Sequence, residues 1–112
     1  MTIFEKIIAR GIPATIVYED DRVIAFRDTD PKAPVHILIV PKRVIRSVNE
    51  LNGQDGSLIA ELILVAKQVA ESEKISGSGY RLVINCNSDG GQSVDHLHIH
   101  LLGGRKMVWP PG

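Results

Sequence analysis

The chain has 112 residues, 44% of them hydrophobic, which is enough for one domain with a single modest core. Thirteen basic residues balance thirteen acidic ones, so no overall field favours nucleic acid or an anionic membrane surface. The apolar runs are too short to cross a membrane, and we expect one domain over residues 1–112 with neither kind of partner. The lone Cys86, and the acidic Glu5 where a secretion signal would be basic and then apolar, predict a cytoplasmic protein.

The first part of the chain predicts a short helix and a hairpin. Thr2 followed by Glu5 is a capping-box pattern, which indicates a helix start. The expected apolar stripe of this helix is Ile3, Ile7 and Ile8. Residues 15–19 and 23–27 have strand composition on either side of the polar turn 20–22, so we expect them to pair.

The middle of the chain predicts a buried strand and a long helix. Residues 28–34 form a loop stiffened by two prolines, which could make a pocket wall. Residues 35–40 are a nearly continuous apolar run with His36 near its start, typical of a central strand. From about 55 to 74, apolar residues recur at three- and four-residue spacing, which predicts an amphipathic helix. Its expected apolar face is Leu58, Ile59, Leu62, Ile63, Ala66, Val69 and Ala70.

The last part of the chain predicts two more strands. After the break at 76–79, residues 80–86 have a strand pattern, and the polar loop 87–93 leads into a run rich in histidine. The order of elements therefore predicts an α+β fold with a mainly antiparallel sheet.

Three of the four histidines alternate with aliphatic residues near the end of the chain. They are His96, His98 and His100, and on a strand they would share one face. Alternate side chains lie roughly 6.6 Å apart, so neighbouring rings can share a proton, a phosphate or a metal ion. This run is the candidate functional site.

Phosphate chemistry is the first interpretation of the three rings. A neutral imidazole can attack phosphorus near pH 7, while a neighbouring ring stabilises charge or donates a proton. The central His98 is the candidate nucleophile, with His96 and His100 in support. Just before them, residues 90–93 (Gly-Gly-Gln-Ser) can turn backbone N–H groups toward an anion, as in a phosphate nest.

A metal site is the second interpretation. A His-x-His pair on a strand can place two nitrogens on one zinc ion, and His36 could add a third ligand. Asp95 has the wrong parity to share the histidine face of a regular strand. A required zinc predicts that a chelator removes activity or stability. We expect no metal or other cofactor to be required.

The sequence resembles the histidine triad (HIT) superfamily, and closely its Hint branch of nucleoside phosphoramidate hydrolases. The motifs that carry the resemblance are Ile3-Phe4 to Ile12-Pro13, Tyr18-Glu19-Asp20-Asp21, Ala33-Pro34-Val35-His36 with Pro41-Lys42, residues 88–93, the three histidines, Gly103-Gly104-Arg105 and Trp109-Pro110-Pro111-Gly112. The resemblance implies a single HIT domain: a five-stranded, mainly antiparallel sheet with two helices. It also implies a homodimer with one ten-stranded sheet and a purine nucleotide site in each subunit.

The activity implied by the resemblance is hydrolysis of adenosine or guanosine 5'-phosphoramidates, which releases the nucleoside monophosphate and an amine. In that reaction His98 matches the nucleophile that becomes nucleotidylated, and His96, His100 and His36 match its supports. Ser93 matches a hydroxyl beside the leaving amine. A nucleotide-sensing interaction module without catalysis is the alternative.

The resemblance also implies the residues that hold the nucleotide. Asp28 matches a carboxylate on the ribose hydroxyls, with Thr29 beside it. The positions that match the phosphate surroundings are Asn85, Gly91 and Gln92, together with Ser93, His98 and His100. Trp109 matches a residue that reaches the partner's site, and Phe4 and Phe26 are expected in the core. Asp95, in place of an aromatic residue, and Val108, in place of a histidine, depart from the pattern.

Overall fold

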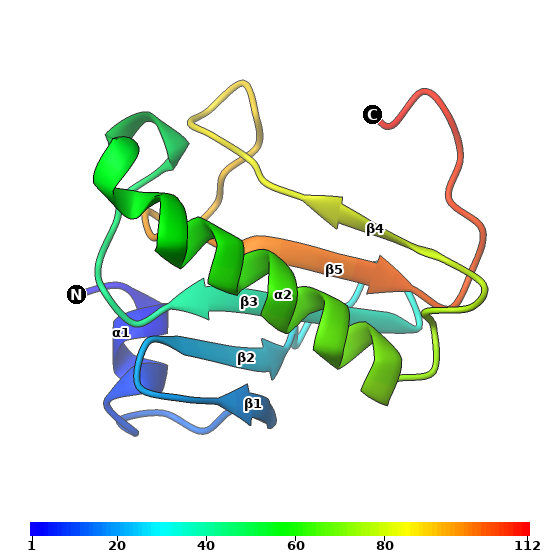
Figure 1. Ribbon diagram of the computed structural model, residues 1–112, viewed down its shortest axis with the longest axis horizontal. Coiled ribbons are helices and arrows are strands. Elements are labelled where there is room, and N and C mark those ends of the chain that lie inside the picture. The colour runs from blue at the N-terminus through cyan, green and yellow to red at the C-terminus, as the bar shows by residue number, and fades with distance from the viewer.

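The computed structural model describes residues 1–112 as a five-stranded antiparallel sheet with two helices (Figure 1). The strands are β1 (Ile16–Glu19), β2 (Val23–Arg27), β3 (Val35–Pro41), β4 (Tyr80–Val83) and β5 (Ile99–Gly103), in the order β1-β2-β3-β5-β4. The helices are α1 (Ile3–Ile8) and α2 (Gly56–Ser72), with short 3₁₀ turns at Val48–Glu50 and Gly53–Asp55. The predicted α+β fold is confirmed. Neither helix has the combination of length and hydrophobicity that a membrane-spanning segment needs.

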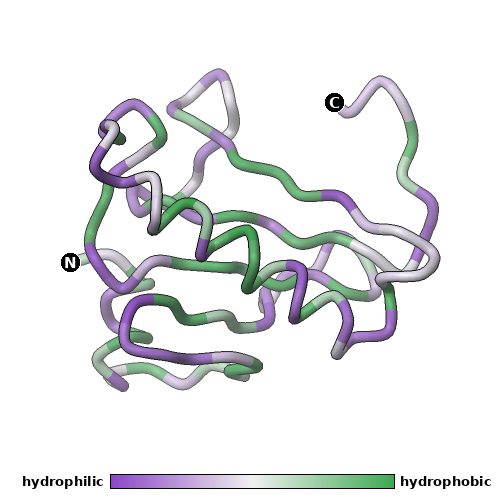
Figure 2. Tube along the Cα trace, in the orientation of Figure 1, coloured by the Kyte–Doolittle hydropathy of each residue, from purple (hydrophilic) through white to green (hydrophobic).

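The sheet separates two apolar layers. Helix α2 packs across β1, β2, β3 and β5, while α1 covers part of the opposite face (Figure 1). The central strands are hydrophobic over much of their length and the turns are hydrophilic (Figure 2). The core under α1 consists of Phe4, Ile7, Ile24, Phe26, Leu38 and Val40. Strand alternation supplies both layers at once, because successive side chains of β2 and β3 point to opposite faces.

Helix α1 begins at the predicted capping box. The Thr2 hydroxyl accepts from the Glu5 backbone N–H at 3.2 Å, and the Glu5 carboxylate accepts from the Thr2 N–H at 3.0 Å. The predicted apolar stripe is confirmed for Ile7, which is buried, and for Ile8, which packs partly buried against the same core, but it was wrong for Ile3, which is 51% exposed. The buried residues of α1 are Phe4 and Ile7. These two residues are three apart and therefore share the face toward the sheet.

Helix α2 is confirmed with slightly shorter bounds than predicted. Its buried face is Leu58, Leu62, Val65, Ala66, Val69 and Ala70. Ile63 was wrongly predicted to be buried, since it is 41% exposed, and Leu64 beside it is more exposed. Each residue turns about 100° around the helix axis, so neighbours of the buried Leu62 and Val65 face outward.

The final two strands are shorter than predicted. Strand β5 begins at Ile99 rather than at the first histidine, because the Leu97 N–H donates to the Ile45 carbonyl and the chain there leaves the ladder. Strand β4 pairs only with β5 and ends at Val83 rather than at Cys86. The side-chain alternation still continues through this irregular part, with Leu97, Ile99 and Leu101 all in the core under α2.

Candidate active site

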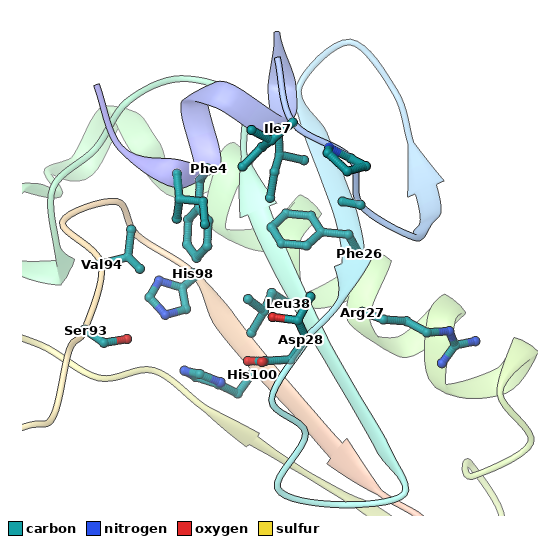
Figure 3. Close-up of a pocket in the computed structure, with 15 residues that line it drawn as sticks. Phe4, Ile7, Phe26, Arg27, Asp28, Leu38, Ser93, Val94, His98 and His100 are labelled. Atoms are coloured by element: carbon teal, nitrogen blue, oxygen red, sulfur yellow. The ribbon is translucent and has the colours of Figure 1, made fainter. Parts of the chain in front are cut away.

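A cavity of about 240 Å³ lies on the α1 face of the sheet (Figure 3). Its apolar part is lined by Ile3, Phe4, Ile7, Ile12, Pro13, Ala14, Phe26, Leu38 and Val94. Its polar part is lined by Arg27, Asp28, Thr29, Ser93, His98 and His100. In Figure 3 the Arg27 side chain extends away from the cavity, where it makes a two-point ion pair with Glu73. The cavity therefore has an apolar end and an end with a carboxylate, hydroxyls and imidazoles.

His98 presents one ring nitrogen for chemistry. Its Nδ1 lies 2.7 Å from the His96 carbonyl oxygen, which can only accept, so Nδ1 carries the proton and donates it. The neutral ring then keeps its lone pair on Nε2. Burial lowers the pKa of His98 below its ordinary value of 6.5, so the ring is neutral near pH 7. A neutral imidazole with a free Nε2 is a competent nucleophile.

His36 and His100 are joined in a fixed tautomeric order. The Lys32 backbone N–H donates to His36 Nδ1 at 3.0 Å, so the proton of neutral His36 lies on Nε2. His36 Nε2 is 2.9 Å from His100 Nδ1, which must therefore accept, leaving the His100 proton on Nε2. Burial, and then the charges of His98 and His36, lower the pKa of His100 to about 4. His100 is thus a neutral ring with a fixed N–H donor.

Asp28 follows β2 and lies beside this pair. Its Oδ2 is 3.5 Å from His36 Nε2, and its Oδ1 accepts from the Asp30 N–H at 2.8 Å. The Asp28 N–H in turn donates to the His36 carbonyl, which fixes the start of the loop against β3. Asp28 and Thr29, the residues for which the resemblance implies nucleotide binding, both line the cavity.

His96 lies outside the cavity lining. It is fully buried, and its Nε2 donates to the Pro41 carbonyl at 2.7 Å, while its Nδ1 has no hydrogen-bond partner. Its ring packs against Phe4, with ring centroids 5.8 Å apart. His96 therefore supports the site through its carbonyl group and its packing, because the carbonyl orients His98.

The loop before the histidines presents Ser93 to the cavity. The N–H groups of Gly91 and Gln92 donate within the loop, to the Ser88 and Asn87 carbonyls. The Gln92 side chain braces the loop: its amide donates to the Arg46 and Val94 carbonyls, and its oxygen accepts from the Asn87 N–H. Gly91 has φ +79°, a conformation that favours glycine. Two of the predicted nest amides, those of Gly91 and Gln92, are thus engaged inside the turn.

Asn85 and Trp109 also lie away from the cavity. Asn85 is in the segment after β4 and does not line the pocket. Trp109 is 81% exposed, and its ring lies 6.0 Å from the guanidinium of Arg81. Arg81 also donates to the Val108 carbonyl, which holds the tail near β4. Within this chain, the site is assembled without Asn85 or Trp109.

Comparison with known proteins identifies the family. A profile of the HIT domain matches residues 9–107. The chain belongs to the HIT domain family. An uncharacterized HIT-like protein from Synechococcus elongatus is 55% identical over 111 residues, which cover 99% of this chain and 96% of that protein. The predicted membership of the HIT superfamily is confirmed.

Solved HIT proteins share the whole fold. A HIT family hydrolase from Legionella pneumophila matches with a TM-score of 0.98 and 52% identity, covering 100% of both chains. A histidine triad nucleotide-binding protein from Candida albicans matches with a TM-score of 0.84 and 27% identity, covering 98% of this chain and 83% of that one.

One cluster of this HIT domain could hold a metal ion. Ligand atoms of Asp28, His36 and His100 all lie within 4.8 Å of one another. A tetrahedral zinc bound by two ring nitrogens would hold them about 3.3 Å apart. The nitrogens of His36 and His100 are 2.9 Å apart and share a hydrogen bond, which a bound metal would have to break. In this structure the two ring nitrogens are therefore spaced for the hydrogen bond from His36 Nε2 to His100 Nδ1.

Sequence reasoning missed part of this HIT site. Phe4 and Phe26 are in the core as expected, but both also line the cavity. Ile7 and Leu38 join them, and their apolar character alone gave no sign of a second role. The Lys32 backbone amide was also missed, because a backbone donor leaves no trace in residue type.

Proposed function

We propose that this HIT domain is a hydrolase that cleaves the P–N bond of purine nucleoside 5'-phosphoramidates. The observation that carries the proposal is the orientation of His98. Its Nδ1 proton is held by the His96 carbonyl, so the Nε2 lone pair is available at a cavity that His98 itself lines. Ring centroids of His98 and His100 are 4.9 Å apart, which brings a neutral donor next to that nucleophile.

In the first step His98 Nε2 attacks phosphorus, forming an N–P bond as the P–N bond to the amine breaks. The departing nitrogen takes a proton from solvent that is relayed through the Ser93 hydroxyl, which lines the same cavity and remains a hydroxyl. His100 donates its Nε2 hydrogen to a phosphate oxygen and stabilises the charge that develops there. The products of this step are a free amine and nucleotidyl-His98.

In the second step water attacks the phosphorus of nucleotidyl-His98. The N–P bond breaks and returns its electron pair to His98 Nε2, while the proton released by the attacking water returns to solvent. The net reaction consumes one water and yields a nucleoside monophosphate and an amine. Every proton is accounted for without a metal ion, so we propose that none is required.

The apolar and polar ends of the cavity would bind different parts of the nucleotide. A purine ring fits the apolar end, where Ile3, Ile7 and Phe26 offer contact area. The Asp28 carboxylate would accept hydrogen bonds from the ribose hydroxyls at the polar end. His98 and His100 then meet the phosphate. Asn85, Gly91 and Gln92 remain predicted phosphate surroundings, with the loop geometry favouring an indirect role for Gln92.

Turnover of adenosine 5'-phosphoramidate tests the proposal. We expect His98→Ala to abolish release of the amine. The unfolding temperature of the variant should stay close to that of wild type, and the variant should still bind AMP. Quenching wild-type protein during turnover should give a phosphorus-labelled histidine that His98→Ala lacks. Full activity in His98→Ala would contradict the assignment of His98 as the nucleophile. Loss of wild-type activity in a chelator would contradict the proposal that no metal ion is required.

The nucleotide-sensing module makes a different prediction for the same experiment. It expects AMP or GMP to bind wild-type protein while no phosphoramidate with any amine is turned over. Binding of purine nucleotide without turnover would therefore favour the sensing module over the hydrolase as the function of this chain.

We also propose that the chain forms a homodimer and acts in the cytoplasm. Strand β4 lies at the sheet edge, and exposed apolar side chains of Leu64, Ile84 and Trp109 are available to a partner. Pairing of two β4 edges would produce a ten-stranded sheet and bring each tail toward the other subunit. The single cysteine suits a reducing compartment.

A further inference from the structure

The turn after β5 is built against the loop that carries Asp28. The guanidinium of Arg105 donates to the Lys32 carbonyl at 3.0 Å. Gly104 has φ +87°, and a Cβ added there would lie 2.9 Å from Pro34 Cβ. Two independent features, a hydrogen bond and a close approach that only glycine permits, therefore join this turn to the loop.

Lys32 is held on both sides of its α-carbon. Its N–H donates to His36 Nδ1 at 3.0 Å, and its carbonyl accepts from Arg105. Every other hydrogen bond of residues 28–34 is made within the loop or with His36. Apart from His36, Arg105 is thus the one group outside residues 28–34 that hydrogen-bonds to this loop.

We propose that Arg105 is a positioning residue that keeps the Lys32 N–H on His36 Nδ1 and so selects the tautomers of His36 and His100. The chain of bonds runs from Arg105 through the backbone of Lys32 to His36, and from His36 to His100. Its last group is the His100 Nε2–H. The assignment of tautomers rests on the structure alone, and its effect on turnover rests on the proposed hydrolase function.

The fixed tautomer matters because imidazole can carry its neutral proton on either nitrogen. If the Lys32 amide moves away, His36 Nδ1 can take the proton, and His36 Nε2 becomes an acceptor. His100 Nδ1 would then carry the proton to preserve the bond between the rings, and His100 Nε2 would lose its hydrogen. The donor at the cavity would become an acceptor without any change in residue type.

Nitrogen NMR of protein labelled at its histidine rings tests this directly, because ring nitrogen shifts distinguish protonated from unprotonated nitrogens. We expect wild-type His36 and His100 to have unprotonated Nδ1 and protonated Nε2 near pH 7. Arg105→Ala and Arg105→Gln should both give a mixture of tautomers at these two rings. Arg105→Lys should recover part of the wild-type signal, since an ammonium can still donate to the Lys32 carbonyl.

Arg22→Gln is the matched control, because Arg22 is an exposed arginine of the β1–β2 turn that pairs with Glu61. It should leave the ring signals unchanged. Wild-type tautomers in both Arg105→Ala and Arg105→Gln would overturn the proposal, whatever their activity. A protonated Nδ1 on wild-type His36, or an equal change in Arg22→Gln, would also overturn it.

Activity gives a second readout. We expect Arg105→Ala to lower kcat about fivefold, the scale of one lost charge-assisted hydrogen bond at an exposed site, with little change in KM. A raised KM with unchanged kcat would contradict a role in orienting His100. If wild-type protein turns over no phosphoramidate, the proposed function fails, while the ring signals still decide the role of Arg105.

Discussion

The ring of Phe4 meets the ring of His98 edge-on, with centroids 4.9 Å apart and an interplanar angle of 85°. Phe4 also makes an edge contact with Phe26 and lines the cavity. One side chain of the short first helix therefore packs in the core, lines the cavity and contributes to the burial of the proposed nucleophile.

Replacing Phe4 should change the pH dependence of turnover. Burial lowers the pKa of His98, so Phe4→Ala, which admits water, should raise that pKa toward its ordinary value of 6.5. Because the neutral ring is the nucleophile, the acid limb of the pH–rate profile should move to higher pH. Phe4→Leu keeps the site drier and is the control with a smaller shift. An unmoved acid limb in Phe4→Ala would contradict this account.

Stability should fall on acidification before the carboxylates titrate. The folded pKa values of His36, His98 and His100 all lie below 6.5, chiefly through burial. At a pH between the folded and the unfolded pKa of a ring, the unfolded chain binds more protons than the folded chain does. The free energy of unfolding therefore rises with pH over that range. This stability is present above about pH 6.5 and is lost on descent toward about pH 4, the folded value for His100.

Urea unfolding at closely spaced pH values measures this loss. His100→Asn removes one of the three titrating rings and should make the free energy of unfolding depend less steeply on pH over the same range. A free energy of unfolding that stays constant between about pH 6.5 and pH 4.5 would count against neutral buried rings.

Asp28→Asn should weaken recognition of the ribose. The amide keeps the size of the side chain and an oxygen for the Asp30 N–H, but it loses the charge that would accept from ribose hydroxyls. We expect AMP affinity, measured by calorimetry, to fall about tenfold. The 2'-deoxy nucleotide is the matched ligand: it should bind wild-type protein more weakly than AMP does, and Asp28→Asn should distinguish the two much less. If Asp28→Asn lowered the affinity for AMP and for the 2'-deoxy nucleotide by the same factor, the proposed contact between Asp28 and the ribose hydroxyls would be wrong.

The N-terminal cap should influence the site through the helix that it starts. Thr2→Ala removes the acceptor for the Glu5 N–H and should lower the free energy of unfolding by about 1 kcal/mol. Thr2→Ser retains a hydroxyl and should stay close to wild type in urea unfolding. Because α1 carries Phe4 and Ile7 to the cavity wall, nucleotide affinity should decrease in Thr2→Ala as well. A fall in Thr2→Ser equal to that in Thr2→Ala would show that the cap is not the cause.

Features that depend on interactions between residues close in the chain were predicted well. The capping box of Thr2 and Glu5, the strands 15–19 and 23–27, and the helix after Asp55 all follow from local periodicity and turn chemistry. Errors arose where a distant contact decided the outcome. The Leu97 N–H bonds to the Ile45 carbonyl, which shortens β5, and the way α1 packs on the sheet leaves Ile3 exposed although it was expected in the apolar stripe.

The amino-acid sequence by itself determined the order of helices and strands, the HIT pattern and the alternation of imidazole with aliphatic side chains, because each depends on spacing along the chain. Only the tertiary structure decided which rings meet. Strand register sets Leu38 opposite His100 and thereby brings His36 within 2.9 Å of it, and packing turns His96 toward Pro41. The Lys32 amide then selects the protonated nitrogens, because a backbone donor acts through its position in space and has no signature in the sequence.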